Sequence, residues 1–249
     1  MKQSKLYMAS STEDLNQVAL KIAKSINLTF IGDLASMKRK NKLKQGCFLL
    51  VVDEGMIYLK DCMDTRSRPI YCNFQKWIKE PKKKNLIRSM KGVPQNSVII
   101  DATAGLGRDA LILSSLSKKV IVIERVPWLH ALLKDGINNS RGIIPSLNHI
   151  KALCCESKKY LSSLKDRPEV IYLDPLFERG TKSKAKKEVQ ALRELVSQTN
   201  EKELLEIALI KARDRVIVKR HRKAKNLAGI KPTYCLKGRV IRYDVYSLV

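Results

Sequence analysis

The chain has 249 residues with 44% hydrophobic content, which is enough to bury the core of an ordinary folded protein. Its 49 lysines and arginines against 24 aspartates and glutamates leave a formal charge of +25. Nucleic acid is the simplest partner for such a charge, and a lysine-rich surface that is merely solvated is the alternative. Six cysteines without a C-x-x-C pair argue against a metal site or a disulfide framework, and no long apolar run predicts a membrane span. We therefore expect a soluble protein of the reducing cytoplasm.

Residues 1–75 are predicted to form a small α+β domain. Apolar residues recur at helical spacing over residues 11–25, which predicts a helix. Residues 48–60 hold two apolar runs separated by a short polar turn with a glycine, a pattern typical of a β-hairpin. Residues 76–96 follow as a basic connector, which we interpret as a phosphate-facing patch with an exposed aromatic residue, Trp77.

Residues 97–249 alternate short β-branched runs with helical segments, which predicts a parallel sheet with helices on both faces. Strands are predicted at residues 97–101, 119–124, 149–154, 170–174 and 215–219. Residues 232–236 and 240–246, joined by a short glycine turn, predict a C-terminal antiparallel hairpin. The expected fold is α/β, with a Rossmann-like sheet of the class I methyltransferase type that ends in this hairpin.

A turn of small residues follows the first predicted strand of this sheet and opens a helix. It runs DATAGLGRD from Asp101 to Asp109. Gly105 and Gly107 let a ligand approach the backbone closely, and the helix start offers unpaired N–H groups and a positive dipole end. A tight turn that binds nothing is the alternative, because a short glycine motif is a weak signal.

Glu124 ends the second predicted strand of the sheet. An acidic side chain at this place accepts hydrogen bonds from ribose hydroxyls, so the glycine turn and Glu124 together predict an adenosine-containing cofactor. A dinucleotide stays possible, because Ala110 stands where G-x-G-x-x-G has its third glycine and is tolerated there. A nicotinamide-dependent oxidoreductase is therefore the first alternative function.

The segment Asp174-Pro175-Leu176-Phe177 stands at the carboxyl end of the fourth predicted strand, the edge at which open α/β sheets bind ligands. It resembles the Asp/Asn-Pro-Pro-Tyr/Phe signature of amino-group methyltransferases. The lone pair of an exocyclic amino nitrogen is delocalised into the ring, and a carboxylate and a backbone carbonyl that accept its N–H bonds can redirect that pair. Phe177 can stack on the base. A strand-ending aspartate followed by a proline turn is the alternative.

These segments together resemble the ribosomal RNA small subunit methyltransferase J family. The agreement rests on DATAGLGRD at 101–109, on Glu124-Arg125 and on YLDPLF at 172–177, and it continues at KKE of 186–188 and RVIVKR of 215–220. The similarity covers the chain from about residue 94 onward and is weaker upstream. It implies S-adenosylmethionine as cofactor and methyl transfer to the N2 amino group of a guanosine in small-subunit (16S) ribosomal RNA. The implied partner is ribosomal RNA or the small ribosomal subunit.

The same resemblance implies particular site residues. The catalytic residues would be Asp174, Pro175 and Phe177. The cofactor contacts would be Arg108, Asp109, Glu124, Arg125, Glu156, Ser157 and Asp174, to which the glycine turn adds Asp101, Gly105 and Gly107. Glu156 departs from the family, in which a small hydroxyl residue is usual. No metal is expected.

Two basic runs are predicted to contact RNA phosphates. Residues 182–187 closely follow the Asp-Pro segment, although a solvated helix start is the alternative for them. Residues 213–225, including Lys219, Lys223 and Lys225, lie at or beyond the end of the fifth predicted strand. A non-enzymatic RNA-binding or ribosome-assembly factor would use the same charge and is the second alternative function.

Overall fold

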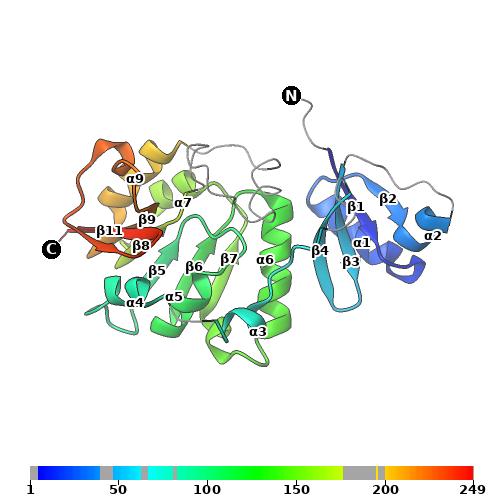
Figure 1. Ribbon diagram of the computed structural model, residues 1–249, viewed down its shortest axis with the longest axis horizontal. Coiled ribbons are helices and arrows are strands. Elements are labelled where there is room, and N and C mark those ends of the chain that lie inside the picture. The colour runs from blue at the N-terminus through cyan, green and yellow to red at the C-terminus, as the bar shows by residue number, and fades with distance from the viewer. Residues whose placement is uncertain are drawn as a thin grey trace. The chain divides into compact units, whose positions relative to one another are not determined.

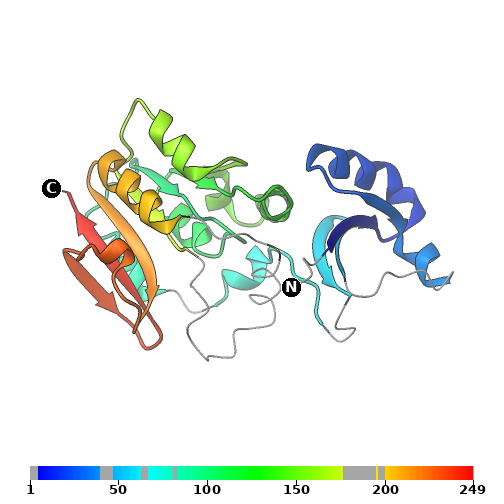
Figure 2. The same ribbon diagram turned by 90° about the horizontal axis from the view of Figure 1, so that it is seen from above.

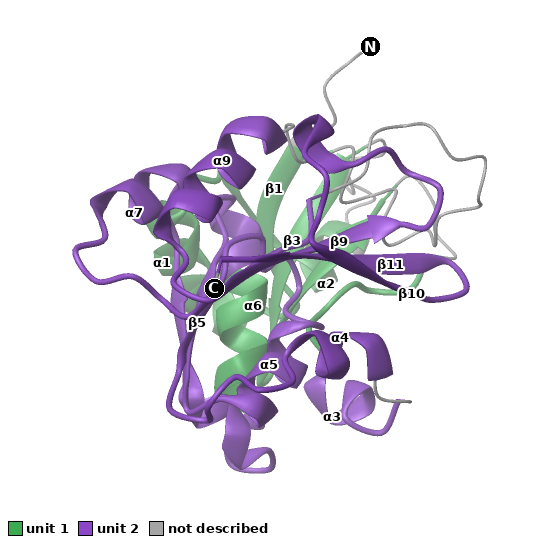
Figure 3. Ribbon diagram, turned by 90° about the vertical axis from the view of Figure 1, so that its left-hand side faces the viewer, with its two compact units in different colours: residues 1–72, 131–139, 181–197 green, residues 73–130, 140–180, 198–249 purple. Residues whose placement is uncertain are grey.

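The computed structural model describes residues 5–39, 47–62, 67–80, 83–175, 195 and 200–248. The chain divides into two compact units, each built around its own sheet (Figure 3). The first unit comprises residues 1–72, 131–139 and 181–197, and the second comprises residues 73–130, 140–180 and 198–249. In the described part of the chain, no helix is long and apolar enough to cross a membrane.

The first unit holds a four-stranded sheet in the order β2-β1-β3-β4. Its strands are β1 (Lys5–Ser10), β2 (Phe30–Asp33), β3 (Cys47–Asp53) and β4 (Met56–Asp61), and its helices are α1 (Asn16–Ser25) and α2 (Leu34–Arg39). β3 and β4 are antiparallel, which confirms the hairpin, and α1 confirms the predicted helix. β1 and β2, which pair in parallel, lie outside the predicted elements. β3 is buried from Cys47 to Val52 and supplies much of this unit's core.

The second unit holds a seven-stranded sheet in the order β10-β11-β9-β8-β5-β6-β7 (Figures 1 and 2). Its strands are β5 (Val98–Asp101), β6 (Lys119–Ile123), β7 (Ile150–Leu153), β8 (Val170–Leu173), β9 (Arg215–His221), β10 (Tyr234–Lys237) and β11 (Ile241–Ser247). Neighbours among β5 to β9 are parallel, whereas β11 is antiparallel to both β9 and β10. This confirms the Rossmann-like class I fold with its C-terminal hairpin.

Helices cover both faces of this sheet, as predicted. The helices that lie wholly in this unit are α3 (Phe74–Trp77), α4 (Lys84–Ser89), α5 (Ala110–Leu116), α7 (Ser157–Ser163) and α9 (Glu201–Lys211), with 3-10 turns at Pro145–His149 and Leu227–Gly229. α6 (Pro127–Ser140) is divided between the units, with residues 131–139 in the first. On one face, Leu161 of α7 and Leu204 of α9 share a core cluster with Ile171 and Leu173 of β8. Because side chains alternate along a strand, Tyr172 points to the other face, where its hydroxyl reaches Asp109 beside α5.

The predicted connector is an integral part of the second unit. Its residues form the end of α3 and all of α4, and the Arg215 side chain donates to the carbonyl of Ser89 at 2.9 Å. Trp77 is only 8% exposed, because its ring packs edge-on against Phe74 with the centroids 5.1 Å apart. The prediction of an exposed aromatic residue at this position was therefore wrong.

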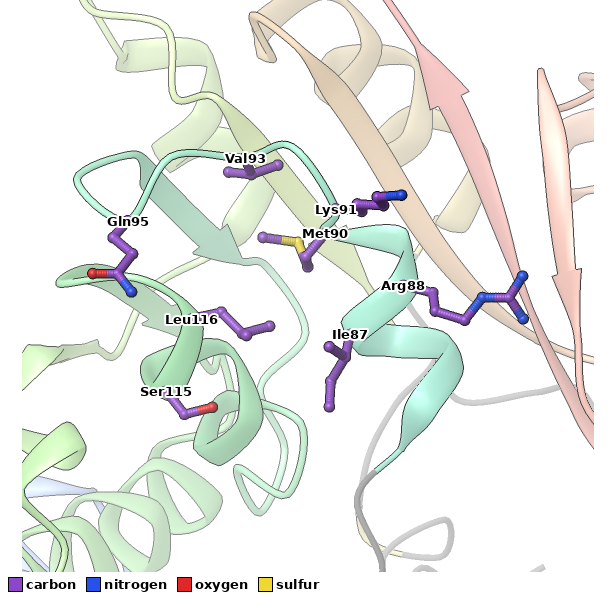
Figure 4. Close-up of a pocket in the computed structure, with 8 residues that line it drawn as sticks. All are labelled: Ile87, Arg88, Met90, Lys91, Val93, Gln95, Ser115 and Leu116. Carbon is purple, nitrogen blue, oxygen red and sulfur yellow. The ribbon is translucent and has the colours of Figure 1, made fainter.

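α4 and α5 line a cavity of about 410 Å³ (Figure 4). Its walls are Ile87, Arg88, Met90, Lys91, Val93, Gln95, Ser115 and Leu116. Gln95 precedes β5, and Leu116 is the last residue of α5, so the cavity lies toward the amino ends of the strands. It is thus remote from the edge at which the predicted site residues stand.

Candidate cofactor and amino-group site

The predicted site residues gather at the carboxyl ends of β5, β6 and β8. β5 is paired with β6 on one side and with β8 on the other, so the chain order reverses at this point of the sheet. Open α/β sheets bind ligands at such a switch point. Asp101 ends β5, Glu124 follows β6 and Asp174 follows β8.

The glycine turn has the backbone of a ligand-binding loop. Gly105 and Gly107 have φ angles of +54° and +80°, which lie in the region that favours glycine. A side chain built at Gly105 would meet no atom within 4 Å, so there is open space beside the backbone. Glu124 fixes the turn from the next strand: its Oε2 accepts the N–H of Gly105 at 3.0 Å and its Oε1 accepts that of Val126 at 2.8 Å.

Glu124 is only 8% exposed. Burial raises the pKa of its carboxyl, and the N–H bonds from Val126 and Gly105 oppose that rise by favouring the charged form. An acidic side chain held beside an open glycine backbone fits the ribose of an adenosine cofactor.

Thr103 connects the glycine turn to the Asp-Pro segment. Its N–H donates to Asp101 Oδ1 at 3.1 Å, and its hydroxyl oxygen accepts the backbone N–H of Asp174 at 2.5 Å. Asp101 is 1% exposed, and burial raises the pKa of its carboxyl to about 8. At neutral pH the Asp101 side chain is therefore mostly protonated. It accepts the N–H of Thr103 within the turn and adds little negative charge to the site.

Asp109 and Asp174 share the ammonium group of Lys219, which lies on β9. The Lys219 Nζ is 2.8 Å from Asp109 Oδ2 and 2.6 Å from Asp174 Oδ2. Asp109 also accepts hydrogen bonds from the Tyr172 hydroxyl, at 2.7 Å, and from Lys83, which precedes α4. Its carboxylate is thus held by three donors.

The electrostatics of this cluster follow from burial and from its two lysines. Burial alone would raise the pKa of Asp109, but Lys219 and Lys83 outweigh it and hold the pKa well below its usual value. The pKa of Asp174 is raised by burial, lowered by Lys219 and raised again by Asp109, with a net rise. Burial would lower the pKa of Lys219, yet the two carboxylates raise it above its ordinary value. Lys219 is therefore charged at any physiological pH.

Two other predicted cofactor contacts, Arg108 and Ser157, have partners outside this cluster. The Arg108 guanidinium lies over the Trp77 ring, 4.7 Å from its centroid, and 3.8 Å from the Glu80 carboxylate. Ser157 is buried at the start of α7, where its hydroxyl donates to the carbonyl of Ala102 at 2.6 Å. That bond ties α7 to the glycine turn.

Glu156 is the N-cap residue of α7, and Arg125 follows Glu124 directly. Pro175 is buried next to Asp174. Phe177 and the basic run at residues 182–187 lie outside the described residues. No group of three or more histidine, cysteine or acidic side chains among the described residues is placed to hold a metal ion.

Two of the lysines predicted to face RNA phosphates occupy a different place. Lys219 is only 15% exposed and is paired with two aspartates, and Lys83 is paired with buried Asp109. The predicted phosphate contact was therefore wrong for Lys219, whereas Lys83 keeps 32% of its side chain exposed beside Asp109. Thr103 and Tyr172 were not singled out at all, although each directly contacts a predicted site residue. The sequence signal for Lys219 was its position within a strand, directly after the buried run Val216 to Val218.

Comparison with known proteins agrees with this geometry. The family model "Putative SAM-dependent methyltransferase" matches residues 33–248. The chain is 43% identical over 157 residues to ribosomal RNA small subunit methyltransferase J of Alkalilimnicola ehrlichii, a match that covers 59% of this chain and 60% of that protein. It is 35% identical over 213 residues to the protein of the same name from Coxiella burnetii, covering 81% of this chain and 84% of that one.

A solved structure shares the fold. The crystal structure of a SAM-dependent methyltransferase from Neisseria gonorrhoeae superimposes with a TM-score of 0.72 at 23% identity, covering 96% of this chain and 95% of that one. None of these matches favours an oxidoreductase or a non-enzymatic factor.

The sheet and its switch-point site define a class I methyltransferase fold, and its cofactor is S-adenosylmethionine. The chain belongs to the ribosomal RNA small subunit methyltransferase J family. The match to the Alkalilimnicola ehrlichii relative spans about 60% of that relative's length.

Proposed function

We propose that this protein methylates the N2 amino group of a guanosine in small-subunit ribosomal RNA. The observation that carries the proposal is the place of Asp174, at the carboxyl end of β8 and tied through Thr103 to the glycine turn. The proposed amino-group acceptor would thereby stand next to the loop that suits the cofactor. The names of the relatives support ribosomal RNA as the substrate class.

Several residues of this chain would hold the cofactor. Glu124 would accept hydrogen bonds from the ribose hydroxyls, and the backbone at Gly105 would allow close approach. Glu156 and Ser157 follow β7 at the start of α7, where they would lie near the adenine, and Arg108 and Arg125 complete the set. When bound, S-adenosylmethionine supplies an electrophilic methyl group that an amino nitrogen can attack in line.

The chain's own contribution to the chemistry is positioning. Asp174 would accept an N–H bond of the guanine amino group, which turns the nitrogen lone pair out of conjugation, and would later take the proton that the nitrogen loses. The carbonyl of Pro175 would accept the other N–H bond. Phe177 remains predicted to stack on the base, which would be held out of its helix. Such alignment can supply a large part of a rate enhancement without a covalent intermediate.

A basic surface at the same edge suits the RNA backbone. It consists of Arg222, Lys223 and Lys225, which follow β9, and Lys237 and Arg239, at the turn between β10 and β11, all of them exposed. The N–H of Arg222 donates to the carbonyl of Val240 at 2.8 Å, so the two segments lie side by side. Residues 215–243 contain no aspartate or glutamate. Phosphates would therefore meet no carboxylate that belongs to these two segments.

Buried Arg242 holds the segment that follows β9 in place. Its guanidinium donates to the carbonyls of Arg222 and Ala224 at 3.0 and 2.7 Å and is paired with Asp244, which has no exposed surface. The loop that carries Arg222 to Lys225 is thus fixed before RNA arrives, which reduces the entropy cost of binding.

The experiment is methylation of small ribosomal subunits from a strain that lacks this modification, with labelled S-adenosylmethionine and the purified protein. Nucleoside mass spectrometry should show N2-methylguanosine. Label on another nucleoside, or no label on either naked 16S RNA or assembled subunits, would contradict the proposal.

We also propose that residues 1–75, 76–96 and 97–249 act as an N-terminal domain, a connector and the methyltransferase domain, and that the protein works in the cytoplasm, where its proposed substrate is found. The connector would be more than a link, because Trp77 and Lys83 contact Arg108 and Asp109.

A further inference from the structure

Lys219 is the one residue on β9 that reaches both acidic motifs of the site. Asp109 belongs to the turn after β5, and Asp174 belongs to the segment after β8. Their Oδ2 atoms lie 2.8 and 2.6 Å from the Lys219 Nζ. The lysine side chain is 15% exposed, whereas those of Asp109 and Asp174 are 6% and 28% exposed.

The pairing leaves Asp174 prepared to accept a hydrogen bond. Lys219 occupies its Oδ2, and the backbone N–H is bound to Thr103. Of the residues that the structure describes, none donates to Oδ1. Asp174 is therefore held at its backbone and at one carboxylate oxygen, while the other oxygen is left for a substrate amino group.

Charge balance at this place depends on Lys219. The titratable or charged groups that face Asp174 from the surrounding elements are Asp101, Asp109, Tyr172, Tyr243, Lys83 and Lys219. Lys219 alone among them pairs directly with Asp174, because Lys83 pairs with Asp109. An unpaired carboxylate buried near a second acid takes up a proton rather than stay charged.

We propose that Lys219 is a positioning residue that keeps Asp174 ionised and aimed at the amino group to be methylated. The inference rests on the function proposed above. A phosphate contact for Lys219 is the competing role, and its low exposure and its two carboxylate partners argue against it.

The direction in which the pH profile should move follows from the groups that act on the pKa of Asp174. Burial and Asp109 raise the pKa of Asp174, and Lys219 lowers it, so removal of the Lys219 charge must raise that pKa further. The ionised form of Asp174 is the active one. A variant without the charge therefore loses activity at neutral pH and regains it as the pH rises, by about tenfold per pH unit while Asp174 is mostly protonated.

The test compares Lys219→Met and Lys219→Arg with the wild type, as single-turnover rates at saturating cofactor and substrate between about pH 6 and 9. Lys219→Met should be slowed about tenfold or more at neutral pH, with its profile displaced to higher pH. Lys219→Arg should keep the wild-type profile. Lys202→Met, at an exposed lysine of α9, is the matched control and should change nothing.

The outcomes separate this inference from the proposed function. A wild type that does not methylate the subunits contradicts the function itself. A methylating wild type and a Lys219→Met variant with an unshifted pH profile, or with only a weaker affinity for cofactor or RNA, overturn the role of Lys219. Should Lys219→Met fail to fold by circular dichroism, Lys219→Gln keeps a polar side chain, removes the charge and must show the same displacement.

Discussion

The backbone N–H of Asp174 donates to the hydroxyl oxygen of Thr103 at 2.5 Å. This single bond joins the turn after β5 to the segment after β8, which are 71 positions apart in the chain. It places the proposed amino-group acceptor relative to the proposed cofactor loop. A change at Thr103 should therefore alter catalysis without removing any group that touches either ligand.

Thr103→Val tests this relationship, because valine keeps the shape of threonine and removes the hydroxyl. The N–H of Asp174 would then lack its partner in a partly buried place, at a cost of about 1–3 kcal/mol in the free energy of unfolding. The turnover rate should fall as well, since Asp174 is no longer held. Urea unfolding and the rate at saturating cofactor measure the two effects, and Thr103→Ser, which retains the hydroxyl, should preserve both.

The sheet of the second unit could be predicted from the sequence because its central strands β5, β6, β8 and β9 are largely buried and rich in β-branched residues. Val170 to Leu173 and Val216 to Val218 are examples, since each is almost fully buried. β2 escaped prediction because only its first two residues, Phe30 and Ile31, favour a strand, while glycine and aspartate, which follow them, are depleted in strands.

The residues at the carboxyl ends of these strands could be predicted as candidate site residues from the sequence. The side chains that pair with them could not. Glycines and an acid at strand ends follow from local sequence, and the structure gathers them at the switch point. The pairs of Lys219 with Asp109 and Asp174 join residues 110 and 45 positions apart. A basic run in the sequence cannot distinguish such a buried lysine from Lys223 or Lys225, which are exposed.

Glu124 offers a test of the cofactor assignment. Glu124→Ala removes the acceptor proposed for the ribose hydroxyls, and hydrogen bonds to a charged group contribute about 1.5–3 kcal/mol. The dissociation constant for S-adenosylmethionine should therefore rise about tenfold or more. Isothermal titration calorimetry measures it. Glu206→Ala, at a more exposed glutamate of α9, is the control, and unchanged affinity in Glu124→Ala would remove Glu124 from the cofactor site.

The basic surface predicts a salt-dependent affinity for RNA. Each phosphate neutralised on a single strand contributes a slope of about −0.7 to the logarithm of the binding constant against the logarithm of salt. Replacement of Arg222, Lys223 and Lys225 by glutamine should weaken binding at low salt and make the slope less steep by about 2. Fluorescence anisotropy with a 16S fragment measures both quantities.

The matched control for this surface is Lys118→Gln with Lys119→Gln. Both lysines are exposed, and they stand at the amino end of β6, the opposite edge of the same sheet. Their replacement should leave the slope unchanged. Losses from the two sets in proportion to the three and two charges removed would mean that RNA responds to total charge and not to the surface beside β9.

Asp174→Ala is expected to abolish methyl transfer even when S-adenosylmethionine is saturating. Asp174 lies at the switch point with one carboxylate oxygen held by Lys219, and the mutation removes the proposed acceptor for the amino group. Loss of such an acceptor should slow the chemical step by about 10²-fold or more.

A rate measured at saturating cofactor distinguishes a catalytic role of Asp174 from a role in cofactor binding. An interaction made mainly in the transition state lowers the maximal rate, whereas a ground-state contact with the cofactor raises only the apparent Michaelis constant. Asp174→Asn sharpens the comparison, because the amide keeps the size of the side chain and one acceptor oxygen but cannot take up the proton. It should be slow at every pH, and more active than Asp174→Ala if orientation contributes as well. A single-turnover rate for Asp174→Ala close to that of the wild type would move the catalytic role to another residue and leave the Asp-Pro segment as a structural turn.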